Sequence, residues 1–296
     1  MTRIVVGNRD GALALSQART IVAELTSEWP DINLVQKTVA SGAGGDTAAL
    51  LGALERNQLS IAVVSLERLP GKLPEGIALA SVTRRLEARS TLIAKGVKEL
   101  GSLPEGARIG VPSARGAQFL KATAPALEAV QLNTGGLDDN LRRLAEGDVA
   151  GLVLPASLLI GLDRRSQIET LLEAELFPPA VGQGSLGLLV REDDDAAMEL
   201  AYTLQHRPSF DRANAERSFA TALEESSAAH LMQQDGVPAI GALATVTGDG
   251  ELTLFGAVVA ASGNMLQATT GGDASEAADL GRELAADFKA QLEKIN

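Results

Sequence analysis

Residues 178–187 read Pro-Pro-Ala-Val-Gly-Gln-Gly-Ser-Leu-Gly, and the arrangement of the whole chain depends on what this stretch does. The two prolines fix the backbone at its start and end any helix that precedes it. The glycines allow the backbone to pass close to another backbone or to a ligand. The apolar run 186–190 predicts a buried strand. The stretch is therefore either an ordinary tight turn before a strand or a crossover that returns the chain from one lobe to another beside a cleft.

The composition restricts the class of protein and of partner. With 296 residues, of which 45% are hydrophobic and 22% charged, the chain is long and apolar enough for two or three globular domains. Its formal net charge of −12 repels the phosphates of nucleic acids, and aromatic residues, at 3%, are too scarce for a base-stacking surface. We therefore expect no nucleic-acid partner.

Neither a membrane nor a metal is expected. No apolar run is long enough to span a membrane, and the sequence starts with a predicted strand rather than a signal peptide, so we expect a cytoplasmic protein. The absence of cysteine excludes disulfides, thiolate metal sites and a cysteine nucleophile. The only histidines, His206 and His230, are too far apart in sequence to predict a metal site.

Alternating strand and helix patterns predict two similar α/β lobes. The strands expected first lie at residues 3–7, 33–38, 60–65, 77–82 and 90–94, with helices at about 14–25 and 47–55. From residue 104 the pattern restarts, with strands at 108–111, 129–132 and 151–154 and helices at 114–122 and 137–146. Acidic residues at 192–195 predict the start of a further helix.

The pattern changes near His206. Two apolar runs, 242–247 and 251–259, flank Gly248-Asp249-Gly250, which is a strong hairpin signal. A last helix after Asp273 carries a single apolar stripe. We therefore expect a separate, small α+β domain at the end of the chain.

Polar groups at two turns are candidates for a ligand site. Arg9 lies where the first strand turns into a helix, an arrangement that attracts anions, although Arg9 could equally be a solvated turn residue. The glycine-rich stretch 40–46 lacks a following Gly-Lys-Ser/Thr, which favours a flexible loop over a phosphate-binding loop. The strand 60–65 ends in polar residues, at the edge where open α/β sheets bind ligands.

Several motifs, in this order and spacing, give the chain a resemblance to a known family. It resembles hydroxymethylbilane synthase, also called porphobilinogen deaminase, over nearly its whole length, and 179–187 is the most specific match. The other matching segments are Arg3–Arg9 with 13–15 and 17–18, 61–63 with 65–66 and Pro70, 103–110, 141–144 with 146–147, and 215–219 with 222–224.

The resemblance implies a fold and a set of domains. The expected fold is α/β, with two lobes like those of periplasmic binding proteins and a small C-terminal α+β domain. The first lobe would comprise residues 1–86 and 185–203, the second 87–184, and the C-terminal domain 204–296. The stretch 178–187 would then be the crossover back to the first lobe.

The resemblance also implies a cofactor that this sequence cannot hold in the usual way. Family members condense porphobilinogen units, with release of ammonia, on a dipyrromethane primer joined to a cysteine by a thioether. Here the attachment motif reads Glu225-Ser226-Ser227, so we expect no dipyrromethane cofactor. Ser227 cannot simply replace the thiol, because a serine hydroxyl is a weak nucleophile without a neighbouring base, and none is evident in the sequence.

The catalytic carboxylate implied by the resemblance is replaced as well. Arg68 stands in place of the family's aspartate, and Glu67 in place of a lysine. A unit charge pair about 4 Å apart is worth roughly 4 kcal/mol at an effective dielectric near 20. Exchanging attraction for repulsion therefore raises the barrier by up to about 8 kcal/mol, or about six powers of ten in rate. Glu67 is an alternative acid, but neighbouring residues of an extended strand point to opposite faces.

Side chains for the substrate's carboxylates are depleted too. The paired arginines of the second lobe read Arg115-Gly116, and the 41–46 loop lacks the family's lysine and aromatic residue. The candidate ligand-binding residues include Arg68, the cation that replaces the family's aspartate. The full set is Arg9, Ser65, Arg68, Arg115, Asp138 and Gln183. We expect Arg9 and Arg115 to contact anions, which arginine binds as a fork, and Gln183 to make a contact at the crossover.

We therefore expect a relative of the enzymes of tetrapyrrole and heme biosynthesis that has lost the deaminase activity. It would bind a small anionic ligand or a partner protein and would not be an enzyme. Two alternatives stay open: a transferase that attaches its primer through Ser227, and an enzyme with different chemistry through Glu67. Losses at several independent positions, in a chain that keeps its core strands and turns, favour the first hypothesis.

Overall fold

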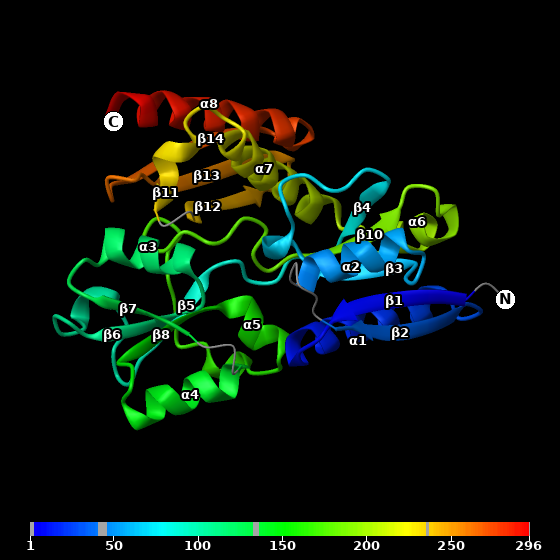
Figure 1. The fold of residues 1–296 in the computed structure, drawn as a ribbon, viewed down its shortest axis with the longest axis horizontal. Coiled ribbons are helices and arrows are strands. Elements are labelled where there is room, and N and C mark those ends of the chain that lie inside the picture. Colours follow the sequence, from blue (N-terminus) through cyan, green and yellow to red (C-terminus); the bar gives the residue numbers. More distant parts are fainter. Residues whose placement is uncertain (1–2, 41–45, 133–135, 235–236, 296) are drawn as a thin grey trace. The chain divides into compact units, whose positions relative to one another are not determined.

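The structure, a computed structural model, describes residues 3–40, 46–132, 136–234 and 237–295 and contains three β-sheets (Figure 1). The chain divides into two compact units, one formed by Met1–Leu86 with Gly184–Ala213 and the other by Glu87–Gln183 with Asn214–Asn296. The predicted α/β fold class, with two sheet lobes and a small C-terminal sheet, is confirmed. The residue boundaries expected for the three domains stay a prediction.

The first unit is built on a five-stranded sheet in the order β2-β1-β3-β10-β4. Its strands are β1 (Arg3–Arg9), β2 (Asn33–Val39), β3 (Ile61–Ser65), β4 (Ile77–Val82) and β10 (Leu186–Arg191). Its helices are α1 (Ala12–Glu28), α2 (Asp46–Glu55) and α6 (Asp195–Tyr202), and the first turns of α7 (Arg207–Glu224) belong to it as well. Strand β1 pairs in parallel with β2 and β3, and β10 pairs antiparallel with β3 and β4.

Helices cover both faces of this sheet because successive side chains of a strand point in opposite directions. Ile61 and Val63 of β3 pack in one core with the buried face of α1 and with α6. Ala62 and Val64, the alternate residues, pack in a second core with α2. The continuous apolar run of β3 is thus that of a strand buried on both faces.

The stretch 178–187 is the predicted crossover and not a local turn. It enters β10, whose Leu186 pairs with Ser65 of β3, so the chain returns from the second lobe into the middle of the first sheet. Gly182 and Gly184 have φ angles of 73° and 84°, in the left-handed region that side chains disfavour. The glycines of the motif are therefore required by the backbone path.

The second unit contains a lobe with its own five-stranded sheet, in the order β7-β6-β8-β5-β9. Its strands are β5 (Ser90–Ile93), β6 (Arg108–Val111), β7 (Glu128–Gln131), β8 (Gly151–Pro155) and β9 (Thr170–Leu171). Its helices are α3 (Ala114–Thr123), α4 (Gly136–Glu146) and α5 (Ala156–Gly161). Strand β6 pairs in parallel with β7 and β8, whereas β5 is antiparallel to β8 and β9.

A second sheet of the same unit, β11-β12-β13-β14, is antiparallel and forms the C-terminal part of the fold. Its strands are β11 (Gln233–Gln234), β12 (Val237–Val246), β13 (Glu251–Val259) and β14 (Met265–Asp273). The predicted hairpin is β12 and β13, and the predicted last helix is α8 (Ala277–Ile295). Strand β14 and the long helix α7 were not predicted.

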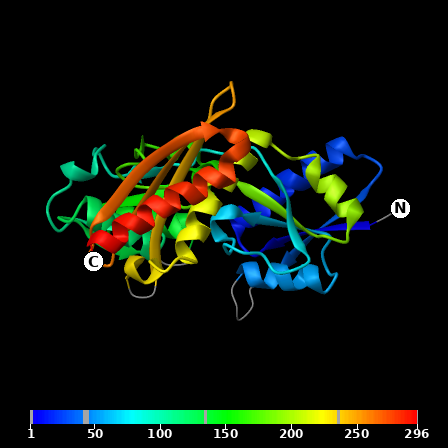
Figure 2. The same ribbon diagram turned by 90° about the horizontal axis from the view of Figure 1, so that it is seen from above.

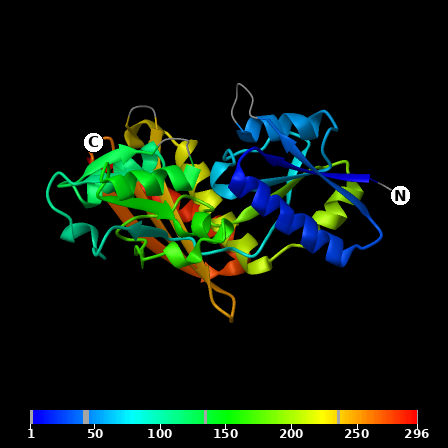
Figure 3. The same cartoon turned by 90° about the horizontal axis from the view of Figure 1, so that it is seen from below.

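The C-terminal sheet is packed on both faces. Figure 2 shows α8 along one face, where Phe288 meets Phe219 of α7 edge to face at 5.2 Å between ring centroids. On the other face, Phe255 and Ala257 share a core with Phe119 of α3, and the view from below in Figure 3 shows the second lobe on that side. The second lobe and the C-terminal sheet therefore form one unit through a common core.

A buried carboxyl group fixes the crossover to this sheet. Glu216 of α7 is fully buried; one carboxyl oxygen accepts the Gly182 N–H at 2.7 Å and the other accepts the Ala244 N–H of β12 at 2.8 Å. The carboxyl group thereby hydrogen-bonds the backbone N–H groups of Gly182 and Ala244, which lie far apart in sequence.

Glu216→Gln is expected to lower the free energy of unfolding by about 3 kcal/mol, because an amide can accept only one of the two buried N–H bonds and turns its NH2 toward the other. Urea denaturation of the full chain measures this. Glu283→Gln, at an exposed position of α8, is the matched control and should change stability by less than about 0.5 kcal/mol. Equal stabilities of the two variants would contradict the role of the buried carboxyl group.

Candidate functional site

The first sheet brings four of the predicted site residues to one edge. Strands β1 and β3 are parallel neighbours, with Val6 opposite Ile61, so Arg9 and Ser65 lie together at the carboxyl ends of both strands. A short 3₁₀ turn, Leu66–Arg68, follows β3 directly and places Glu67 and Arg68 at the same edge. This is the edge at which open α/β sheets bind ligands.

The backbone of this turn is held in place by hydrogen bonds. The Leu66 N–H donates to the Ser185 carbonyl at 3.0 Å, and the Thr47 hydroxyl donates to the Arg68 carbonyl at 3.2 Å. The Arg68 side chain is exposed, and that of Glu67 is half-buried. We expected Glu67 and Arg68 to lie on an extended strand and therefore to point to opposite faces. The two residues instead form a 3₁₀ turn, which has three residues per turn, so the expected strand was wrong.

A buried asparagine that sequence reasoning missed positions Arg9. Asn8 is fully buried, and its Nδ2 donates to the Arg9 carbonyl at 2.8 Å and to the Thr38 hydroxyl at 3.3 Å. Its Oδ1 accepts from Gln36 Nε2 at 2.9 Å, which ties the end of β1 to β2. The only signal in the sequence was a polar residue at the end of an apolar strand.

The start of α1 adds positive potential to this edge. Gly11, with φ 109°, occupies the cap position, and no side chain caps the helix there. Because the first N–H groups of a helix and its dipole favour anions, this end complements Arg9 and Arg68. Asp10 and Glu67 are the carboxylates of the same edge, and Asp10 Oδ1 accepts the Gly11 N–H at 2.8 Å.

In the second unit, Arg115 and Asp138 follow the carboxyl ends of β6 and β7. Arg115 lies in the first turn of α3, donates to the Pro178 carbonyl at 2.9 Å and stacks over the Phe119 ring at 5.2 Å from its centroid. Asp138 is exposed in the first turn of α4 and pairs with Arg164 at 3.4 Å. Their predicted ligand contacts stay predictions, and residues 133–135 and 41–45 of the expected site lie outside the described residues.

Gln183 is a buried residue that holds the crossover together. Its Oε1 accepts the Ala180 N–H at 3.2 Å, and its Nε2 donates to the Ala88 carbonyl at 2.5 Å and to the Ser90 hydroxyl at 3.4 Å. Only 2% of the residue is exposed, so in this structure its amide is used by the chain itself. The contact with a ligand that we expected at the crossover is untested.

The two serines at the position of the family's cysteine are both engaged. The Ser226 hydroxyl donates to the Leu223 carbonyl at 2.8 Å and accepts the Ala228 N–H at 3.2 Å, which closes the end of α7. The Ser227 hydroxyl donates to Glu293 Oε1 of α8 at 3.3 Å. No base was evident near Ser227 in the sequence, because Glu293 is brought within hydrogen-bonding distance only by the packing of α8.

These residues do not fit a thioether-linked dipyrromethane. A thioether requires sulfur, the chain has no cysteine, and the hydroxyls at this position already bond to a backbone carbonyl and to a carboxylate. Among the described residues, no group of three or more His, Asp or Glu side chains could hold a metal ion.

A histidine directly before α7, in the first unit, has a shifted pKa. Burial lowers the pKa of His206 below its usual value of 6.5, and the positive charges of Arg84 and Arg212 lower it further. Its Nδ1 accepts the Ser209 N–H at 3.3 Å and lies 2.8 Å from the Ser209 hydroxyl, which accepts the Arg85 N–H at 2.9 Å. The neutral imidazole therefore joins α7 to the segment that follows β4.

The fold and the two sheet edges define a class: an α/β protein of two sheet lobes and a C-terminal α+β part, with cationic residues at the carboxyl ends of its strands. Residues 4–199 match the family described as "Porphobilinogen deaminase, dipyromethane cofactor binding domain". The chain belongs to the porphobilinogen deaminase family, as the sequence motifs indicated.

Similar proteins cover nearly the full length. The porphobilinogen deaminase of Thermus thermophilus is 38% identical over 98% of this chain and 97% of its own, and that of Deinococcus deserti is 36% identical over 98% and 96%. Among solved structures, a TRAP periplasmic solute binding protein from Desulfovibrio salexigens is 13% identical, covers 69% of this chain and 72% of its own, and has a TM-score of 0.46. None of the described helices is long and apolar enough to cross a membrane.

The shifted pKa of His206 predicts a pH dependence of stability. Because the folded state disfavours the protonated imidazole, the unfolded chain binds the proton more readily between the folded pKa and 6.5. The contribution of His206 is thus complete above pH 6.5 and is lost as the pH falls through that value toward the folded pKa.

Urea denaturation of wild type and His206→Asn between about pH 8 and pH 5 tests this, because asparagine also accepts an N–H bond but does not titrate. The stability difference should be constant at the alkaline end and shrink below pH 6.5 as the wild type loses stability faster. Parallel profiles for the two proteins would show that His206 does not carry the effect.

Proposed function

We propose that this member of the porphobilinogen deaminase family does not assemble pyrroles on a cysteine-anchored primer and instead binds a small anionic ligand at the edge formed by Arg9, Ser65 and Arg68. The observation that carries the proposal is Arg68. Its backbone is fixed by the turn after β3, at the position where the family resemblance puts a catalytic aspartate. A cation there repels the positive charge that develops on pyrrole intermediates, although its exposure to solvent weakens the effect.

The same edge is suited to a carboxylate. Arg9 and Arg68 offer guanidinium groups, which bind carboxylates through paired hydrogen bonds, and the uncapped start of α1 favours negative charge. Ser65 adds a hydroxyl group at the end of β3, the strand next to β1 in the sheet. These groups favour a carboxylate of tetrapyrrole biosynthesis as the ligand. The other possibility is a partner protein. In either case we expect the protein to act in the cytoplasm.

Protein incubated with porphobilinogen and then freed of small molecules should show an unchanged intact mass and no colour with Ehrlich's reagent, and the supernatant should contain no hydroxymethylbilane. The physical reason is the combination of a missing thiol and a cation in place of the catalytic carboxylate. The Thermus thermophilus relative, treated identically, is the positive control for the assay. A covalently attached dipyrrole would overturn the proposal.

Calorimetry with porphobilinogen tests the ligand site itself. Arg9→Ala and Arg68→Ala should each weaken binding about tenfold, as expected for the loss of one charge-assisted contact. Arg19→Ala, which removes an exposed arginine from the middle of α1, should leave the affinity unchanged. Unchanged affinity in the first two variants, or no binding to wild type, would remove the ligand site and leave the partner-protein interpretation.

One observation favours a second candidate, a transferase with attachment through Ser227. The Glu293 carboxylate accepts from the Ser227 hydroxyl at 3.3 Å and supplies the neighbouring base that a serine nucleophile needs. Attachment at this position predicts a covalent adduct in the wild type and none in Ser227→Ala. An adduct that persists in Ser227→Ala but not in Glu67→Gln would instead indicate different chemistry through Glu67.

A further inference from the structure

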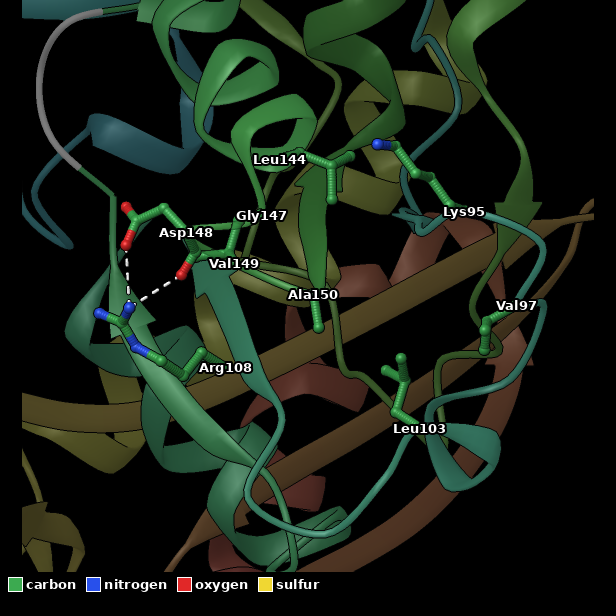
Figure 4. Close-up of a pocket in the computed structure, with 9 residues that line it drawn as sticks. All are labelled: Lys95, Val97, Leu103, Arg108, Leu144, Gly147, Asp148, Val149 and Ala150. Atoms are coloured by element: carbon green, nitrogen blue, oxygen red, sulfur yellow. Dashed lines mark hydrogen bonds and ion pairs between the residues drawn. The ribbon is translucent and has the colours of Figure 1, made fainter.

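A pocket in the second unit is lined by none of the candidate site residues. Figure 4 shows its lining, which comes from the segment after β5, the loop before β6, the end of α4 and the turn before β8. Its volume is about 360 Å³, within the range of pockets that hold small organic ligands. Arg108 begins β6 and Ala150 precedes β8, so the pocket lies at the amino ends of these parallel strands, whereas Arg115 follows the carboxyl end of β6.

One side of the pocket is apolar. Leu103 and Leu144 line it, and the neighbouring Val149 is buried in the core beside β8. Leu103 and Leu144 are only half-buried, so they present hydrocarbon surface to the pocket. A ligand with an apolar body would cover this surface and gain the free energy of removing it from water.

Charged groups lie around the rest of the pocket: Arg108 and Asp148 are in its lining, and Arg143 is bonded to Asp148. Asp148 accepts hydrogen bonds from Arg143 at 2.6 Å and from Arg108 at 2.8 Å. The bond from Arg143, and to a lesser extent that from Arg108, lowers the pKa of the Asp148 carboxyl group. Two arginines thus share one carboxylate that stays ionised at neutral pH. The group of Arg108, Arg143, Lys95 and Asp148 carries three positive charges and one negative charge, in a chain whose net charge is −12.

Lys95 is the cation of this group that has no carboxylate partner. Its Nζ lies 3.4 Å from the Ala145 carbonyl, and no carboxylate of the described residues forms an ion pair with it. In Figure 4 its ammonium group lies on the side of the pocket toward Leu144. One ammonium group beside an apolar wall suits a single carboxylate better than a phosphate, which needs more donors.

We propose that this pocket binds a small carboxylic acid with a compact apolar body, such as an aromatic or branched-chain acid. The carboxylate accepts from Lys95 Nζ, and the apolar body packs against Leu103 and Leu144. The site is separate from the edge of the first sheet, and its occupation does not depend on whether that edge binds a ligand.

Phenylacetate is the probe, with its neutral counterpart 2-phenylacetamide as the ligand control. In methyl NMR spectra of the full-length protein, phenylacetate should cause saturable shifts of Leu103, Leu144 and Val149 at millimolar concentration. Phenylacetamide should bind about tenfold more weakly, because it cannot pair with the ammonium group. Equal binding of the two compounds, or no saturation with phenylacetate, overturns the proposal.

Matched variants locate the contact. Lys95→Gln should weaken phenylacetate binding about five- to tenfold, whereas Lys98→Gln, an exposed lysine on the same segment that does not line the pocket, should leave it unchanged. Ala150→Leu, at an exposed position of the lining, should fill the pocket and abolish binding without lowering the melting temperature. Equal affinities of the two lysine variants, or full binding to a folded Ala150→Leu, would place the ligand elsewhere and overturn the site.

Discussion

The buried carboxyl group of Glu216 is the interaction on which the path of the chain depends. It accepts the N–H of Gly182 in the crossover and of Ala244 in β12, and so joins the stretch between the lobes to the C-terminal sheet. Gln183, the next residue of the crossover, satisfies three further polar groups from within the chain. A buried backbone group without a hydrogen-bond partner costs free energy. The Glu216 and Gln183 side chains therefore restrict the conformation of the crossover.

The motif positions that this chain keeps and those that it changes differ in their surroundings. Asn8, Gln183 and Glu216 are buried and hydrogen-bonded to backbone groups, so replacing any of them would leave a polar group unsatisfied. Arg68 and Ser227, which depart from the family's catalytic and attachment residues, are exposed. Substitution at exposed positions costs the fold little, which is how the family's architecture can persist in a chain without its cysteine.

The charges of the molecule are unevenly distributed. Although the chain carries a net charge of −12, cationic groups gather at the carboxyl ends of β1 and β3 and, in the second unit, around the pocket of Lys95 and Arg108. At the first place the uncapped start of α1 adds positive potential, while Asp10 and Glu67 balance the two arginines in formal charge. Around the pocket, Lys95, Arg108 and Arg143 outnumber the single carboxylate of Asp148. The local excess of positive charge around the pocket favours anions in spite of the overall charge.

The sequence by itself determined most of the secondary structure and the family. The apolar period of two or 3.6 residues located the strands of both lobes except β9, and the helices α1 to α4. The order of the motifs, above all 179–187, indicated the crossover that leads into β10. Strand β14 was not predicted from the sequence, because its exposed residues are mostly Gln, Thr and Gly and it lacks a strong apolar alternation.

Only the tertiary structure decided which groups meet. The Ser227–Glu293 contact joins residues 66 positions apart, the Glu216 bonds span 34 and 28 positions, and the pocket assembles four separate segments. The turn at Leu66–Arg68 likewise replaced an expected strand alternation, because the Leu69 N–H bonds to the Leu66 carbonyl and closes a 3₁₀ turn. Local sequence patterns record which face of an element is apolar, but contacts between distant segments follow from packing, which no local pattern encodes.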